Sequence, residues 1–94
     1  MPRKILERIR DKIRSNDYDF SKHAHDEMNE DRLHTADAEQ AILTGRIERA
    51  EKDDPRGTKY VILGVGADGV TPVGTVGRFD EAGYYLILTV YKLD

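Results

Sequence analysis

The sequence predicts an α+β domain, with N-terminal helices packed on one face of a four-stranded, mainly antiparallel sheet. Apolar residues recur at helical spacing in the first half of the chain and alternate at strand spacing in the second half. Turn-forming pairs such as Asp68-Gly69 separate the alternating runs. Helices followed by strands are typical of this fold class. Because 94 residues suffice for one core, we expect residues 1–94 to form a single domain.

Three helices are expected before the strands, each from its own start and stop signals. Proline suits a first helical position, serine and threonine cap helices, and glycine after a helix provides a left-handed stop. The expected limits are Pro2 to about Ser15, Ser21 to about Arg32, and Thr35 to Gly45. The segment between the first two helices, Tyr18–Phe20, is predicted to be an extended linker.

Four strands are expected at residues 47–52, 58–65, 70–79 and 84–91. The last strand has two faces of different polarity. Its aliphatic face contains Leu86, Leu88 and Val90, and its other face contains Tyr85, Ile87, Thr89 and Tyr91. We expect the aliphatic face to contact the helices, which leaves the face with tyrosine and threonine for solvent or a ligand.

The charges are unevenly distributed, although the net charge is only −3. Residues 1–14 contain six basic and two acidic side chains, whereas residues 15–45 contain two basic and eight acidic ones. The first helix is therefore predicted to offer Arg3, Lys4 and Arg10 to RNA or to an acidic partner. The alternative is a solvated helix face with internal ion pairs.

The composition also bears on the compartment and on cofactors. The chain has no cysteine, which excludes disulfides and thiolate chemistry. No segment approaches the ~20 apolar residues of a membrane span, so we expect a cytoplasmic protein without a membrane partner. Gly64 to Gly69 matches the dinucleotide pattern G-x-G-x-x-G, but a strand follows where that site needs a helix. We expect no cofactor, and no metal either, because His23 and His25 point to different sides of a helix.

The stretch Ser21-Lys22-His23-Ala24, followed by Met28 and Arg32, resembles DUF4258, a family of small bacterial proteins. Gly45–Glu48 is similar to the family's step from helix to first strand, and Leu88–Tyr91 is similar to its closing strand. The resemblance covers roughly residues 18–92. It implies kinship with toxins of the RelE and BrnT type, which are small ribonucleases held in check by an antitoxin. In two places the chain departs from the family: Glu27 stands where an arginine is usual, and Gly74 where many members have a histidine.

This resemblance suggests RNA phosphodiester transfer, and the chain has candidates for each chemical role. Imidazole suits proton transfer near neutral pH, and cations on strands or loops suit phosphate binding. The predicted catalytic residues are His23, Tyr91 and Lys59, and the predicted substrate-binding residues are Arg32, Arg56, Arg78 and Thr89. His23 is expected to be half-buried beside the apolar stripe of its helix. The alternative is a structural histidine bonded to Glu27, with the cations simply exposed to solvent.

The leading functional hypothesis is a toxin-like protein of a type II toxin–antitoxin pair, acting as a metal-independent RNA endonuclease or descended from one. Its expected partners are an antitoxin protein and RNA. The alternatives are a non-catalytic protein- or RNA-binding module of the same fold and an obligate partner subunit. A geometric prediction accompanies the first hypothesis. His23 and Tyr91 should approach one shared depression, with Lys59 on an adjoining strand.

Overall fold

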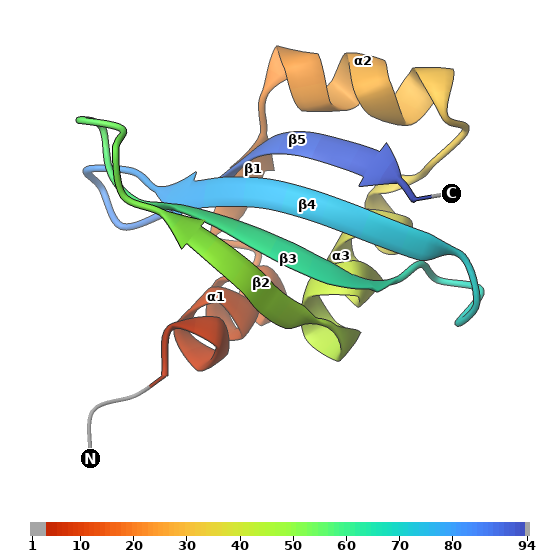
Figure 1. Cartoon of the computed structure of the whole chain (residues 1–94), viewed down its shortest axis with the longest axis horizontal. Helices are drawn as coiled ribbons and strands as arrows, with labels where there is room; N and C mark the ends of the chain where they lie inside the picture. The colour runs from red at the N-terminus through yellow and green to blue at the C-terminus, as the bar shows by residue number, and fades with distance from the viewer. Residues whose placement is uncertain (1–3, 94) are drawn as a thin grey trace.

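The computed structural model describes residues 4–93, which form three helices and a five-stranded mixed sheet (Figure 1). The helices are α1 (Ile5–Arg14), α2 (Lys22–Glu30) and α3 (Thr35–Thr44). The strands are β1 (Tyr18–Phe20), β2 (Arg46–Glu51), β3 (Lys59–Val65), β4 (Pro72–Phe79) and β5 (Tyr85–Lys92). They lie in the order β1-β5-β4-β3-β2. The α+β class and the sequence of helices before the main strands are as predicted.

The strand β1 occupies the stretch predicted to be a linker. Tyr18 and Phe20 pack against the core while Asp19 is exposed, and this alternation is too short to stand out in the sequence. β1 runs parallel to β5, with Tyr18 opposite Tyr85. The prediction of a four-stranded, mainly antiparallel sheet is therefore wrong. The described residues form five strands, and the β1–β5 pair makes the sheet mixed.

One hydrophobic core joins the three helices to one face of the sheet. Burying these side chains is the main driving force for the fold. The helical members of the core are Ile9, Ile13, Ala24, Met28, Ala38, Ala41 and Ile42, and the strand members are Ile62, Val73, Tyr85, Ile87 and Val90. Each helix thus buries the apolar stripe that its sequence predicts.

A bulge in β5 changes which of its residues face the core. Val76 of β4 pairs with Thr89, but the next residue, Gly77, pairs with Ile87. Leu88 is therefore the extra residue between two rungs of the ladder. Because side chains alternate along a strand, one extra residue exchanges the two faces on either side of it.

The faces of β5 consequently differ from the predicted ones. Tyr85 and Ile87, before the bulge, and Val90, after it, are 0% exposed and lie in the core. Leu86 and Leu88 are partly exposed and lie outside it. The prediction is correct after the bulge, for Thr89, Val90 and Tyr91, and wrong for Tyr85, Leu86, Ile87 and Leu88, because strict alternation cannot include a bulge.

The hydroxyl group of Tyr85 is buried and, among the described residues, has no hydrogen-bond partner. Its ring packs on Gly77, where a Cβ atom would lie 2.6 Å from Cζ, and edge-on to Phe79 at 5.4 Å. Burial raises the pKa of Tyr85, so the hydroxyl stays protonated. Tyr85→Phe keeps the ring and removes the unpaired group, and should raise the free energy of unfolding by about 1–2 kcal/mol. Urea denaturation measures this change, and a destabilised variant would mean that the hydroxyl is paired.

The helix α2 runs alongside β5 at the margin of the sheet, whereas α3 passes behind the strands in Figure 1. Beyond the short β1, side chains of α2 and its flanking residues bond to the outer backbone of β5. The bonds run from Ser21 Oγ to the Leu88 carbonyl (3.0 Å), from the Val90 N–H to Glu27 Oε1 (3.2 Å) and from the Lys92 N–H to Asp31 Oδ2 (3.3 Å). The helix thus takes the place of a strand, and the edge of β5 is not left for another chain to pair with.

Two glycines let α3 pack directly against the backbone of the sheet. A Cβ atom on Gly64 would lie 2.2 Å from the Ala41 carbonyl oxygen, and one on Gly45 would lie 2.2 Å from that of Leu63. Gly45 has a φ of −89°, so the predicted left-handed stop is wrong and close packing explains the residue instead. The N-cap of α3 is His34, one residue before the predicted Thr35.

The turn between β3 and β4 is organised by one carboxylate. Asp68 accepts hydrogen bonds from the Val70 N–H, the Thr71 N–H and the Thr71 hydroxyl, at 2.9, 2.9 and 2.5 Å. These bonds, led by that of the Thr71 hydroxyl, lower the pKa of Asp68 to about 2. A lowered pKa means that the ionised carboxylate stabilises the turn above about pH 4, and that this stabilisation is lost as the pH falls toward about 2.

Acidification should therefore loosen this turn before the rest of the fold. Hydrogen exchange at the Val70 and Thr71 amides, followed by NMR between about pH 4 and pH 2, should show protection falling more steeply than in the strands. Asp68→Asn is the reference, because its amide does not titrate in this range. An identical pH dependence in the variant would show that another group controls the turn.

Candidate functional site

The strand register determines which residues lie on the face of the sheet opposite the core. Paired residues share a face, and successive residues alternate. Ile62 packs against the helices, so Val61 and its partners lie on the other side, which we call the open face. Its rows are Arg46–Leu63–Gly74–Tyr91, Arg49–Val61–Val76–Thr89, and the two pairs Glu51–Lys59 and Arg78–Leu86.

Cations from three strands lie on the open face, and one carboxylate lies between two of them. Glu51 contacts Arg49 Nε at 3.0 Å through Oε2 and Lys59 Nζ at 3.8 Å through Oε1. The hydrogen bond with Glu51 raises the pKa of Arg49, so its guanidinium is permanently charged. Arg78 of β4 adds a further positive charge. Because one carboxylate, Glu51, serves two cations, the rows of the open face carry more positive than negative charge. This excess of positive charge favours binding of a phosphate backbone.

Tyr91 lies across β4 on this face. A Cβ atom on Gly74 would lie 2.3 Å from Tyr91 Cζ, so the ring occupies the space that any other residue at position 74 would fill. A phenol from β5 and a guanidinium from β2 thus lie on the same face of the sheet, with Thr89 on the row of Arg49.

His23 lies on the side of α2 that faces away from His25. The ring of His25 packs 5.4 Å from that of Phe20, whose side chain contacts the core. Residues two apart on a helix point about 160° apart, which directs His23 away from the side of α2 that contacts Phe20. Its side chain is 71% exposed, so the expectation of a half-buried histidine is wrong.

Glu27 connects His23 to the sheet. Its Oε1 atom lies 3.5 Å from His23 Nε2 and accepts the Val90 N–H at 3.2 Å. Val90 directly precedes Tyr91, so these two contacts place the imidazole at the β5 margin of the open face. The carboxylate that departs from the family pattern therefore has a structural role. That His23 and Tyr91 share one depression stays a prediction.

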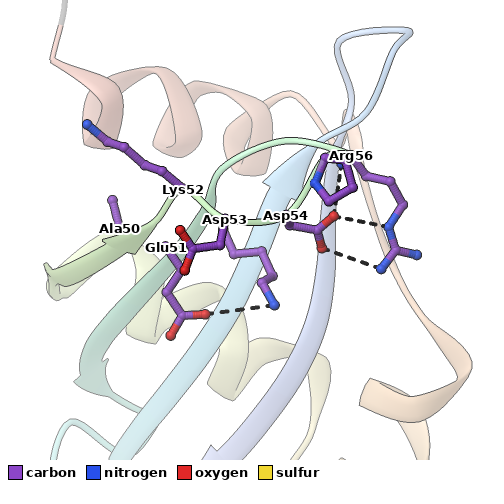
Figure 2. Close-up of a pocket in the computed structure, with 8 residues that line it drawn as sticks. Ala50, Glu51, Lys52, Asp53, Asp54 and Arg56 are labelled. Carbon is purple, nitrogen blue, oxygen red and sulfur yellow. Dashed lines mark hydrogen bonds and ion pairs between the residues drawn. The ribbon is translucent and has the colours of Figure 1, made fainter.

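Two hollows lie at the other end of the sheet. The first is lined by residues 50–56 and Lys59, and the second by Pro55, Arg56, Arg78 and residues 80–82 (Figure 2 shows the first). Arg56 lines both and pairs with Asp54 at 3.3 and 3.4 Å. The Nε atom of Arg78 is buried without a hydrogen-bond partner among residues 4–93. The structure therefore brings three of the predicted cations to one end of the open face.

The predicted site residues consequently fall into two groups. Lys59 precedes Leu63, which shares the row of Tyr91, by four residues, and a strand rises about 3.3 Å per residue. The rows of Lys59 and Tyr91 are thus about 13 Å apart along the sheet. One group contains His23, Thr89 and Tyr91, and the other contains Arg56, Lys59 and Arg78.

Arg32 belongs to neither group. It follows the C-terminal end of α2 with a φ of 58°, a left-handed conformation that a non-glycine residue rarely adopts. The bond from the Leu33 N–H to the Met28 carbonyl, 2.8 Å, closes the helix around it. The side chain is exposed, next to the point where Asp31 contacts Lys92.

The predicted site lacked Arg49, which the structure places on the same face of the sheet as Tyr91, one row away. Ile47 pairs with Ile62 on the core side, and simple alternation would put Arg49 on that side too. A bulge between these two residues of β2 brings Arg49 opposite Val61 on the open face. The weak apolar alternation of this strand was the one signal of an irregular register.

Arg10, one of the three cations predicted to meet a partner, serves the fold instead. Arg10 donates from Nε to the Ile42 carbonyl at 3.1 Å and from Nη2 to the Gly45 carbonyl at 2.7 Å. It therefore caps the C-terminal end of α3 and is unavailable to a partner. Lys4 is exposed, and Arg3 lies outside the described residues.

The glycine pattern at residues 64–69 also has structural explanations. Gly64 allows the close packing of α3, and Gly69 has a φ of 74° in the turn that Asp68 organises. Gly66 lies against Asp37, whose Oδ1 atom accepts the N–H of the following residue at 2.8 Å. Within residues 4–93, no three histidine, cysteine or acidic side chains gather closely enough to hold a metal ion.

Comparisons with known proteins identify a family for most of this fold. No curated protein and no solved structure matches the chain significantly. None of the helices in residues 4–93 is long and apolar enough to cross a membrane. Residues 20–92, from the end of β1 to the end of β5, match the family described as a domain of unknown function, DUF4258. This match includes the residues of the open face, the helix α2 and the closing strand β5. The chain therefore belongs to the DUF4258 family.

Proposed function

We propose that this protein is a toxin-like, metal-independent RNA endonuclease of a type II toxin–antitoxin pair. The observation that carries the proposal is the open face itself. Cations from β2, β3 and β4 lie on the face that also holds Tyr91, and the exposed His23 lies at its margin. The kinship with RelE- and BrnT-type toxins that the family resemblance implies belongs to the same proposal. The implied partners are RNA and an antitoxin protein, and the implied compartment is the cytoplasm.

The proposed chemistry is an attack within the RNA itself, with proton transfers by side chains of this chain or by water. His23 takes the proton of a ribose 2′-hydroxyl, whose oxygen then attacks the adjacent phosphorus. The bond from phosphorus to the 5′-oxygen breaks, and that oxygen takes a proton from the Tyr91 hydroxyl or from water. Arg49 stabilises the negative charge on the phosphate oxygens. The products are a 2′,3′-cyclic phosphate and a 5′-hydroxyl end.

The proposed arrangement gives Glu27 a supporting task. A carboxylate beside an imidazole orients the ring and stabilises its charged form. The bond from the Val90 N–H fixes the carboxylate, so the position of His23 is tied to the backbone of β5. A mobile surface histidine would lack this constraint.

A second candidate is a non-catalytic RNA- or protein-binding module of the same fold. The observation that favours it is the distance of about 13 Å between the rows of Lys59 and Tyr91. A cation on a row that far from Tyr91 is placed to hold another part of an RNA strand and not the phosphate at Tyr91. This candidate keeps the open face as the interface and removes the cleavage step.

Growth of bacteria after induced expression separates the two candidates. The endonuclease is expected to slow growth, and His23→Ala is expected to relieve this because the 71% exposed side chain supplies no core packing. His25→Ala is the matched control, since it changes the same residue type on the opposite side of α2. Equal toxicity of wild type and both variants, at equal amounts of folded protein, would contradict a catalytic His23. Harmless expression of the wild type would favour the binding module.

A further inference from the structure

The ring of Tyr91 lies face-down on the sheet. For a Cβ atom on Gly74, the nearest ring atom would be Cζ at 2.3 Å, followed by Cε2 and Oη, both bonded to Cζ, at 2.6 Å. A point in the plane of the ring, outside its rim, would be closer to Oη or Cε2 than to Cζ. The Cβ position of Gly74 therefore lies over the face of the ring, so one face of the ring is turned toward Gly74.

This placement leaves the other face of the ring directed away from Gly74. Tyr91 is half-buried, and the covered side is the one on Gly74. Glycine at position 74 is what permits it, because any side chain there would lift the ring. Aromatic rings on a face that also carries cations are the surfaces on which unpaired bases stack, and Arg46 and Arg49 are the cations on this part of the open face.

The cations are arranged to hold a backbone beside such a base. Arg46 shares the row of Tyr91, and Arg49 lies on the next row. Both come from β2, which β3 and β4 separate from β5, so a phosphate chain along β2 would place its bases over β3 and β4. The ring of Tyr91 lies over β4, within that path.

We propose that Tyr91, held flat by Gly74, stacks on one unpaired base and makes the open face selective for single-stranded RNA over duplex RNA. The inference rests on the proposed function, since it assumes that the open face takes RNA. A base within a duplex is stacked on its neighbours and has no free face for the ring. The ring, and not the hydroxyl, carries this selectivity.

Fluorescence anisotropy with a labelled 2′-O-methyl oligoadenylate tests the proposal. The 2′-O-methyl group removes the nucleophile, so binding is measured without cleavage. Tyr91→Phe keeps the ring and should bind within about twofold of wild type, whereas Tyr91→Leu should bind about tenfold or more weakly, the loss expected for one stacked base. Gly74→Ala should weaken binding about as much as Tyr91→Leu, because it lifts the ring. A blunt duplex of the same length should bind all four proteins equally and weakly.

The control is Tyr84→Leu, which removes a 47% exposed tyrosine from the turn at the other end of β5 and should leave binding unchanged. Circular dichroism verifies that each variant is folded. If Gly74→Ala does not fold, the comparison of Tyr91→Phe with Tyr91→Leu decides the outcome. The stacking role would be overturned, without affecting the proposed function, if Tyr91→Leu bound as tightly as wild type or if wild type bound duplex and single strand with equal affinity. Absence of any binding by the wild type would overturn the proposed function together with it.

Discussion

Gly64→Ala is expected to destabilise the protein by about 3 kcal/mol or more, which is a large part of the total stability of a domain this size. The added methyl group would lie 2.2 Å from the Ala41 carbonyl oxygen and 2.9 Å from its Cα. Both are backbone atoms of a packed helix, so no rotamer change relieves the contact. The helix α3 would have to move away from β3 and open the core between them.

Circular dichroism and urea denaturation measure this effect. Gly69→Ala is the graded control, because Gly69 has no atom within 4 Å of an added Cβ but has a φ of 74°. It should cost only about 1 kcal/mol, from the strained backbone alone. If Gly64→Ala were no less stable than Gly69→Ala, the close packing of α3 on the sheet would be incorrect.

Arg10→Ala should lower the free energy of unfolding by about 2–4 kcal/mol. The guanidinium, 18% exposed, donates to two carbonyl groups at the end of α3, and each charge-assisted bond contributes about 1.5–3 kcal/mol at most. Its removal also leaves the negative end of the α3 dipole without a cation.

Arg14→Ala is the matched change in the same helix, because Arg14 is 56% exposed and pairs only with Asp11 among the ion pairs described. Surface pairs of this kind contribute about 0.5 kcal/mol or less. The decrease in the free energy of unfolding, measured by urea denaturation, should therefore be several times larger for Arg10→Ala than for Arg14→Ala. If both variants lost the same free energy of unfolding, Arg10 would be a solvated surface residue, which is the alternative that the charge pattern of the first helix also allowed.

Local sequence signals predicted the parts of the fold that depend on neighbouring residues. The apolar spacing of Ile9 and Ile13 and the cap at Ser21, whose Oγ accepts the Ala24 N–H at 3.1 Å, need only one or two helical turns of sequence. Leu88 gives no such signal, because a bulge depends on the partner strand. The three residues of β1 are also too few for a pattern and become a strand only through β5.

The same limit applies to the candidate site. Residue type and strand parity were enough to select Tyr91 and Lys59, but not to show that their rows lie about 13 Å apart. Arg49 was missed because the bulge in β2 exchanges its face. Gly74, a departure from the family pattern in the sequence, gains its meaning only from the Tyr91 ring that lies on it.

The central claim is that the open face and His23 cleave RNA. Its most direct test incubates the purified protein with 5′-labelled single-stranded RNA in the presence of EDTA and identifies the ends of the products. We expect fragments with 2′,3′-cyclic phosphate ends, formed by wild type and His25→Ala and reduced about 10²- to 10⁴-fold in His23→Ala, as expected for loss of a proton-transfer group. Intact RNA with the folded wild type, or equal cleavage by His23→Ala, would contradict it.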